Sequence, residues 1–303
     1  MDIFLKQLVN GLSLGSIYAL IALGYTMVYG IVKLINFAHG DVMMIGAYLG
    51  YFVLRAMGAT PSGLVCAFLA AMVGCGLLSL VIERLAYRPL RNAPRLNSLI
   101  TAIAVELILQ NGMRVLPFVG PNPRQFPTMP TKVFSLATKA YPNGLISISN
   151  IQLIVIILSA VLMLVLNYII NYTKTGKAMR AVSHDLGASS LMGINVNRTI
   201  AITFVIGSVL AGAGGVLYAT AYPQINPTMG YIPGLKAFVA AVLGGIGSVP
   251  GAMLGGIILG VVETMTKAYI SSQYADAISY CILIVILLVK PTGLLGKKQR
   301  VKV

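Results

Sequence analysis

Charged side chains are scarce in this sequence. Asp, Glu, Lys and Arg make up only 10% of it, against 57% hydrophobic residues. Soluble globular domains carry about a quarter charged residues, so a soluble domain is excluded and much of the apolar surface has to face lipid. A helix that crosses a bilayer needs about 20 apolar residues, so the chain has room for about eight or nine spanning helices.

Cysteine and histidine are also scarce. The three cysteines, Cys66, Cys75 and Cys281, all lie inside apolar runs, where we expect them to be small buried hydrophobic residues. Their spacing fits neither a disulfide framework nor a metal site. The two histidines, His39 and His184, are too far apart for a local metal-binding pair. We therefore expect no metal centre in this chain.

Acidic residues are the scarcest charged kind, with 7 Asp and Glu against 22 Lys and Arg and a net charge of +15. Such a charge is typical of nucleic-acid binding, but here no aromatic residues interleave with the basic ones to stack on bases. Instead the basic residues cluster between apolar runs, as they do in cytoplasmic loops of membrane proteins. We therefore expect a membrane and no nucleic acid as partner. The clusters are Arg84, Arg88, Arg91 and Arg95; Lys174, Lys177, Arg180 and Arg198; and Lys290, Lys297, Lys298, Arg300 and Lys302.

The apolar runs predict an all-α integral membrane protein, a polytopic helical bundle of about eight or nine transmembrane segments that forms one domain over residues 1–303. The first run continues through Gly30, so we expect it to be a retained helix. The turn residues at 247–251 should divide 234–268 into two helices. The expected helices cover about 8–30, 42–58, 62–86, 96–116, 150–172, 199–221, 234–247, 250–268 and 276–290.

The connections between the apolar runs predict the orientation of the chain. Basic loops stay in the cytoplasm, which places 87–95, 173–198 and 291–303 on that side. The connection 117–149 is rich in Pro and Gly, cannot be helical throughout and belongs in water. The count of crossings puts it on the periplasmic side, together with the uncharged segment 222–233.

Small residues recur four positions apart within the apolar runs. This spacing places them on one face of a helix, where they let two helices approach closely in lipid. We interpret them as packing contacts; the alternative is an interface that slides during a transport cycle. The pairs are Gly11 and Gly15, Gly46 and Gly50, Gly251 and Gly255, and Gly256 and Gly260.

Three polar residues, Asn36, His39 and Asp41, lie between the first two apolar runs. A His and an Asp this close could shuttle protons along a pathway. The alternative is a structural role, in which these side chains cap the helix expected to begin near Val42.

Glu106 lies in the middle of an expected spanning helix. On a helix it shares a face with Gln110 and Arg114. An ionisable residue within a membrane segment indicates a functional site by default, but pairing along this face would also explain it. Glu83 and Glu263 lie near expected helix ends, where a long side chain can reach the interface.

The segment 173–198 lies between two spanning helices and predicts a short helix over about 178–192, ended by Gly193. Such a helix would lie across the cytoplasmic end of the bundle and offer a surface to another protein; the alternative is an ordinary solvated helix. Residues 175–178 lack the upstream Gly and the Ser or Thr after Lys that a phosphate-binding loop needs. We therefore expect no ATPase site in this chain.

Residues 181–195 resemble the coupling loop of ABC importer permeases. Their ending, Gly193-Ile194-Asn195, is the form found in branched-chain amino acid permeases and their sugar-permease relatives. The resemblance implies that this loop contacts an ATP-binding subunit. The residues it implies are Arg180, Ala181, Asp185, Ala188, Gly193, Ile194 and Asn195.

Four further stretches, 10–30 with 35–41, 82–91, 236–252 and 290–296, are similar to LivH-type members of this family. The resemblance covers nearly the whole chain. It implies a type II-like permease of the bacterial inner membrane that imports branched-chain amino acids by alternating access. The implied partners are a second, homologous permease chain, two ATP-binding cassette subunits and a periplasmic binding protein. ATP would be bound by the partners, and this chain would hold no cofactor.

Three alternatives stay open on the sequence. Urea or short-amide permeases are similar through 35–40, so the substrate could differ. A standalone secondary transporter or channel would need an ion site near the middle of the membrane, for which Glu106 is the acidic candidate. A membrane-embedded enzyme would need a catalytic cluster, which the sequence does not present.

Overall fold

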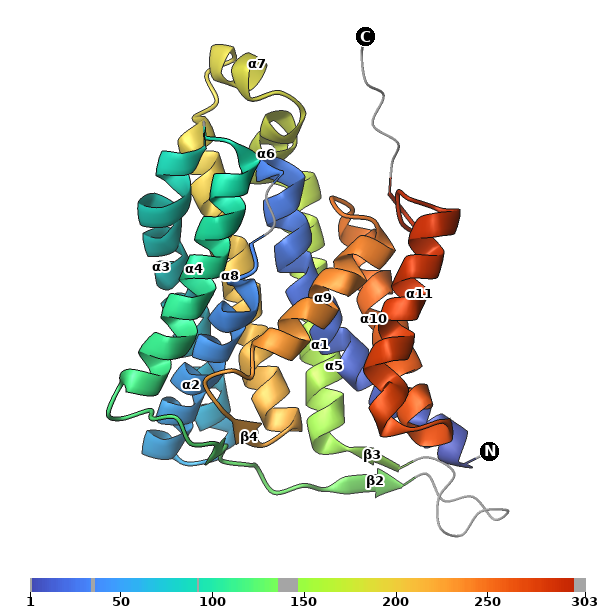
Figure 1. Ribbon diagram of the computed structural model, residues 1–303. Helices are drawn as coiled ribbons and strands as arrows, with labels where there is room; N and C mark the ends of the chain where they lie inside the picture. The colour runs from blue at the N-terminus through green and yellow to red at the C-terminus, as the bar shows by residue number, and fades with distance from the viewer. Residues whose placement is uncertain (1, 34–35, 92, 136–146, 297–303) are drawn as a thin grey trace.

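The computed structural model describes residues 2–33, 36–91, 93–135 and 147–296, which form a helical bundle (Figure 1). Part of the predicted periplasmic connection, 136–146, lies outside these residues, as do Ile35 and the basic residues after 296. The helices are α1 (Asp2–Val32), α2 (His39–Met57), α3 (Pro61–Ile82), η1 (Glu83–Tyr87), η2 (Arg88–Leu90), α4 (Arg95–Val115), α5 (Asn150–Tyr172), α6 (Lys174–His184), α7 (Leu186–Leu191), α8 (Val196–Ala221), α9 (Tyr231–Gly244), α10 (Val249–Tyr269), η3 (Ser272–Tyr274) and α11 (Ala275–Val289).

Seven helical segments of the described chain are long and apolar enough to cross a membrane. Two further helices, α2 and α9, lie within the bundle without meeting that criterion, and α9 has only 14 residues. At about 1.5 Å per residue, α9 falls short of a hydrocarbon core of about 30 Å. The prediction of a polytopic helical membrane protein is confirmed. The seven segments are Ile3–Val32, Pro61–Leu90, Leu96–Val115, Asn150–Tyr172, Val196–Ala221, Val249–Tyr269 and Ser272–Val289.

The outer helices α3, α4, α5 and α11 expose large apolar side chains, as lipid-facing helices do. On α3 they form a stripe four residues apart, Val65, Leu69, Val73, Leu77 and Val81. Cys75 is buried, Cys66 is half-buried and Cys281 is exposed on α11. The expectation of burial was therefore wrong for Cys281, because an apolar run in a membrane protein does not show which of its faces meets lipid.

The core of the bundle forms around α1, which packs against α10, α8, α9 and α5. The contact with α10 depends on small residues. A Cβ added to Gly260 would lie 2.2 Å from the backbone nitrogen of Gly15, and one added to Gly256 would lie 2.3 Å from that of Ala19. The predicted close packing through glycine is confirmed here.

The two ends of the bundle carry different segments (Figure 1). At one end β1 (Arg124–Gln125) pairs antiparallel with β4 (Gln224–Ile225), and β2 (Val133–Ser135) pairs with β3 (Ser147–Ser149). At the opposite end lie α6 and α7. The described parts of 117–149 and 222–233 are thus together, away from the basic segment 173–198. Which end faces the cytoplasm stays a prediction.

The helix α2 begins inside the bundle, about halfway along it (Figure 1). Its first residue is His39, three positions before the expected start, and Ala38 at the N-cap makes no side-chain hydrogen bond. The prediction that Asn36, His39 and Asp41 cap this helix is wrong, because these side chains contact neighbouring helices instead. After α9, the predicted break lies at residues 245–248, and Ser248 caps α10 by accepting from the Gly251 amide at 3.2 Å.

Candidate functional site

The N-terminal ends of α2 and α9 meet inside the bundle through glycines. A Cβ on Gly40 would lie 2.4 Å from the Gly230 carbonyl oxygen, and one on Gly230 would lie 2.2 Å from the Gly40 carbonyl oxygen. Only glycine permits this approach of two backbones. Non-helical backbone at membrane depth occurs where it is buried in protein or lines an aqueous cavity. The crossing therefore marks the interior position where a pathway is to be sought.

Two carboxylates and an amide meet beside this crossing. Gln110 of α4 donates from Nε2 to both carboxylate oxygens of Asp41, at 3.3 and 3.2 Å, and lies 3.4 Å from Oε1 of Glu106. Asp41 is buried, and Glu106 is half-buried. Arg114, expected on the same face, instead donates to Asn111 at 3.2 Å. The predicted contact between Glu106 and Gln110 is present, without the expected cation.

Asn36 and His39 lie on either side of the same turn. The hydroxyl of Tyr87 donates a hydrogen bond of 2.6 Å to Oδ1 of Asn36. Tyr87 belongs to η1, a π-helical turn, and such turns are frequent at functional sites. The ring of His39 contacts that of Tyr25 at 4.8 Å between centroids, and its Nε2 has no partner among the described residues. No hydrogen bond joins His39 to Asp41, because residues two apart on a helix do not face each other.

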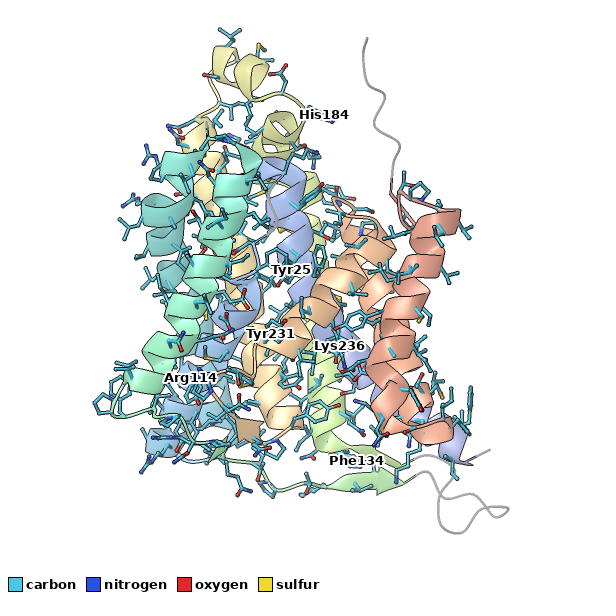
Figure 2. The ribbon with its side chains drawn as sticks, in the orientation of Figure 1. Tyr25, Arg114, Phe134, His184, Tyr231 and Lys236 are labelled. Atoms are coloured by element: carbon cyan, nitrogen blue, oxygen red, sulfur yellow. The ribbon has the colours of Figure 1, made fainter. Side chains whose placement is uncertain are left out.

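Three pockets follow α1 from this crossing towards the end that carries α7. The first, of about 20 Å³, is lined by Tyr25, Asp41, Glu106 and Tyr231, among others; Figure 2 labels Tyr25 and Tyr231 at the centre of the bundle. The second, of about 10 Å³, shares Tyr25 and adds Tyr29. The third, of about 590 Å³, shares Tyr29 and also touches Tyr87 of η1, Arg91 and Leu186 of α7.

The carboxylates of Asp41 and Glu106 form no ion pair with any lysine or arginine that the structure describes. The N-terminus of α2 offsets a negative charge by about 0.3–1 kcal/mol. A charged residue at the centre of a bilayer costs about 2.5–3.5 kcal/mol on insertion scales. One helix end thus offsets only part of the cost of burying two ionised carboxylates, and no cation among the described residues supplies the remainder.

A second buried charged cluster is balanced by its own residues. Lys236 of α9 lies 2.7 Å from Oε1 of Glu263 and 2.7 Å from Oδ1 of Asp276, and Lys267 lies 2.6 Å from Oε1 of Glu263. Tyr18 of α1 donates to Oε2 of Glu263 at 2.9 Å. We interpret this cluster as a structural contact that joins α1, α9, α10 and α11.

The expectation that Glu83 and Glu263 reach towards the membrane interface was wrong. Both side chains are buried, Glu263 in the cluster with Lys236 and Glu83 in an ion pair with Arg91. A cation on a neighbouring element draws each carboxylate inward. Sequence reasoning missed Lys236 as a partner, although a lone lysine within an apolar run was a usable signal.

The segment predicted as one helix over 178–192 forms two, α6 and α7. The helices are separated by Asp185, whose carboxylate accepts from the Ala188 amide at 2.9 Å and caps α7. Gly193 ends α7 with a φ of 80°, as expected of a residue that closes a helix. Ile194 donates from its amide to the Ser189 carbonyl, and Asn195 caps α8.

The remaining predicted coupling residues lie around these turns. Arg180 donates to the carbonyls of Ile170 and Asn171 at the end of α5. Ala181 is half-buried on α6, and Ala188 is exposed on α7.

The tip of α7 carries an apolar surface that sequence reasoning missed. Leu191, the last residue of α7, is 89% exposed, and Met192, which follows it, is 83% exposed. The helix α7 lies at one end of the molecule (Figure 1). The adjacent Leu-Met pair ahead of Gly193, in an otherwise polar segment, was a signal for it.

Of the described residues, no three His, Cys, Asp or Glu side chains gather as metal ligands.

Comparison with known proteins identifies relatives over the whole length. A family model described as "Branched-chain amino acid transport system / permease component" matches residues 7–287. The chain is 46% identical to the high-affinity branched-chain amino acid transport system permease protein LivH of Salmonella typhimurium, over 99% of this chain and 98% of the relative. It is 44% identical to BraD of Pseudomonas aeruginosa, a permease protein of the same description, with the same coverage. A fructose import permease, FrcC of Rhizobium meliloti, is 28% identical over 35% of this chain. No solved structure matches the chain.

Proposed function

This chain belongs to the family of branched-chain amino acid transport permeases, and we propose that it is the membrane-embedded permease subunit of an ATP-driven importer of branched-chain amino acids. It is a multi-pass protein of the inner membrane and a transport protein rather than an enzyme. Relatives that match over the whole length carry the name of this transport system, which favours branched-chain amino acids over urea or a short amide.

The exposed tip of α7 is the observation that carries the ATP-driven mechanism. Leu191 and Met192 are highly exposed, and α7 projects from one end of the bundle (Figure 1). Exposed apolar side chains on a projecting helix are typical of a surface that another protein covers. A standalone transporter or channel, the alternative, has no need of such a surface. We assign it to one of two ATP-binding cassette subunits, which bind the ATP.

The other partners follow from the same assignment. A second, homologous permease chain completes the membrane core, and a periplasmic binding protein delivers the amino acid at the end formed by β1 to β4. Closure of the ATP-binding subunits moves α6 and α7. These helices contact α1, α5 and α8, so a shift at α7 can change the packing of the spanning helices and open the cavity towards the cytoplasm.

Reconstitution tests the proposal. The chain is expressed with the homologous permease chain, the ATP-binding subunits and the binding protein of its transport system. The complex is purified through a tag on this chain and placed in proteoliposomes that contain ATP. We expect the ATP-binding subunits to co-purify and labelled leucine, isoleucine or valine to enter in an ATP-dependent manner. Uptake without ATP, or uptake of urea in place of these amino acids, would contradict the proposal.

A further inference from the structure

The cavity of about 590 Å³ lies at the α7 end of the bundle, where three spanning helices begin or end (Figure 1). Its wall includes Val32, the last residue of α1, Leu96, the second residue of α4, and Ile200, the fifth residue of α8. The ends of spanning helices meet the region of the lipid head groups. The cavity therefore lies at the level of the membrane surface rather than in the middle of the bilayer.

The wall of this cavity is mostly apolar. Leu96 lines it and is 68% exposed, on an outer helix whose other apolar side chains face lipid. Tyr29 and Tyr87 also line it, and tyrosine is frequent at this level of membrane proteins, where the ring meets acyl chains and the hydroxyl meets water. Such a wall suits a hydrocarbon chain. The aliphatic and phenyl side chains that supply most of it are Ile31, Val32, Leu96, Leu99, Ile200 and Phe204.

The two charged residues of the wall are both basic. Lys33, which directly follows α1, is exposed and forms no ion pair with any acidic residue that the structure describes. Arg91 pairs with Glu83 and donates to Asn197, so its charge is already matched. No Asp or Glu is among the described residues that line the cavity. The wall therefore carries one unmatched positive charge, on Lys33.

The elements around the cavity add to this positive charge. Three exposed arginines on η1, η2 and α8 form no ion pair among the described residues. Of the acidic residues on neighbouring elements, Glu83 is paired with Arg91, and Asp185 accepts from the Ala188 amide. This end of the bundle therefore attracts anions. The three arginines are Arg84, Arg88 and Arg198.

Lys33 also has an unusual backbone conformation. Its φ of 56° is the one positive φ of a non-glycine residue in the part of the chain that the structure describes. Its amide donates to the Tyr29 carbonyl at 2.9 Å, which holds the turn that ends α1. Strained residues of this kind cluster at ligand-binding sites. The turn keeps the lysine on the wall of the cavity.

We propose that this cavity binds an anionic phospholipid from the leaflet at the α7 end, which is predicted to be the cytoplasmic one. The phosphate group lies against Lys33 and the remaining donors of Arg91, and an acyl chain lies along the apolar wall. Basic pockets between spanning helices on the cytoplasmic side bind anionic head groups. A volume of about 590 Å³ is within the range of ligand-binding cavities. An amino acid fits less well, because its ammonium group would find no carboxylate on this wall.

Photolabelling in lipid nanodiscs tests the proposal. The full chain, purified with the subunits that remain bound to it, is placed in nanodiscs of phosphatidylcholine. A trace of phosphatidylglycerol with a diazirine on its acyl chain is added, or the same analogue of phosphatidylcholine in a parallel sample. Labelled peptides are identified by mass spectrometry. We expect phosphatidylglycerol to label the peptide that contains Leu96 and Leu99 at least fivefold more than phosphatidylcholine does. Equal labelling by the two lipids would overturn the proposal.

Variants of the two parts of the site sharpen the test. Lys33→Asn removes the charge but keeps the turn, because asparagine tolerates a positive φ. We expect it to lower labelling by phosphatidylglycerol about fivefold, which corresponds to about 1 kcal/mol for one lysine near an anionic surface. Leu99→Trp, which fills the apolar wall, should lower labelling as well and decides if Lys33→Asn does not fold. Lys177→Asn, exposed on α6 and not part of the wall, is the matched control. Labelling of Lys33→Asn or Leu99→Trp at the level of this control would overturn the proposal.

Competition separates the lipid from other ligands that this cavity could hold. Inorganic phosphate carries the charge of the head group without a chain, and leucine is a substrate of the proposed function. We expect neither to displace phosphatidylglycerol from the cavity when ionic strength is held constant with sodium chloride. Displacement by phosphate would identify a site for free phosphate, and displacement by leucine would make the cavity part of the substrate pathway. Either result would overturn the assignment to lipid. The labelling requires no transport, so its outcome is independent of the proposed function.

Discussion

Lys236 and Glu263 form a buried ion pair in which Nζ lies 2.7 Å from Oε1, although the residues are 27 positions apart. Glu263 is also approached by Lys267 and Tyr18, whereas Asp276, the other partner of Lys236, has a half-exposed side chain. The carboxylate of Glu263 is therefore the centre of this cluster, and its removal leaves a buried lysine with an incomplete set of partners.

The first prediction concerns that carboxylate. We expect Glu263→Leu to lower the stability of the folded chain by about 3–5 kcal/mol, since one partner of a buried pair is lost. Asp276→Asn, the matched control, should cost about 1 kcal/mol or less because Asp276 is partly solvated. Thermal unfolding in detergent can be followed with a thiol-reactive fluorophore on the buried Cys75, in a chain with Cys66→Ser and Cys281→Ser. Equal losses in both variants would contradict the assigned roles.

The second prediction concerns the contact between α2 and α9. Gly40→Ala and Gly230→Ala should each destabilise the bundle by about 1–3 kcal/mol and reduce transport, because the new methyl group meets a backbone oxygen. Gly112→Ala on α4 is the control. A Cβ there meets nothing within 4 Å, and alanine favours a helix by about 0.5–1 kcal/mol over glycine. If Gly40→Ala has the same melting temperature and transport rate as Gly112→Ala, the two backbones do not approach each other as closely as described.

The third prediction concerns the tip of α7. The double variant Leu191→Ser, Met192→Ser and the single variant Ala188→Glu should insert and fold normally, because these side chains are exposed. We expect both to recover several-fold less ATP-binding subunit in a detergent pull-down, with uptake reduced in proportion. Lys177→Ala, exposed on α6, is the control. Full recovery of partner by both variants would show that α7 is an ordinary solvated helix.

Gly193 permits a fourth prediction from backbone conformation alone. A φ of 80° costs a β-branched residue about 1–2 kcal/mol, whereas asparagine tolerates this region. No atom lies within 4 Å of a Cβ at this position, so a steric clash plays no part. Gly193→Val should therefore reorient α7 and lower recovery of the ATP-binding subunit, and Gly193→Asn should not. If the Gly193→Val and Gly193→Asn variants recover the same amount of ATP-binding subunit, the positive φ of Gly193 is not needed for the contact with that subunit.

The orientation of the chain is the fifth prediction. Thr131 lies just before β2 and Ser190 lies in α7, and both residues are exposed. Because β2 and α7 lie at opposite ends of the bundle (Figure 1), single cysteines at these positions should react with a membrane-impermeant reagent from opposite sides. Positive charge in the segment 173–198 places Ser190 in the cytoplasm. The assay uses intact cells and inverted vesicles of a strain that expresses the chain without Cys281, which is itself exposed. Labelling of both positions from the same side would refute the topology.

Much of this architecture could be predicted from the sequence because lipid imposes strong local conditions. A segment within the bilayer must be apolar and must satisfy its own backbone hydrogen bonds, and both conditions are visible in a window of about 20 residues. The spanning helices, the glycine contacts between α1 and α10, and the turn at Gly193 all depend on such local features.

The boundaries at α2 and at the predicted helix 178–192 could not be predicted in the same way. Local chemistry favoured Asn36, His39 and Asp41 as caps, but tertiary contacts with Tyr87, Tyr25 and Gln110 determine where they point. The spacing of residues in the sequence favours a helix that continues through Asp185, but in the structure Asp185 caps α7 and so separates α6 from α7.

The sequence by itself determined the class of the protein, its membrane segments, and the polar residues around which a site could form. Only the tertiary structure decided which of these residues meet. Asp41 and Gln110 are 69 positions apart, Asn36 and Tyr87 are 51 apart, and Tyr18 reaches Glu263 across 245. Hydropathy shows that a segment lies in the membrane but not which of its faces packs inward. Partners so distant in the chain are brought together by the packing of whole helices, and no local pattern of residues encodes that packing.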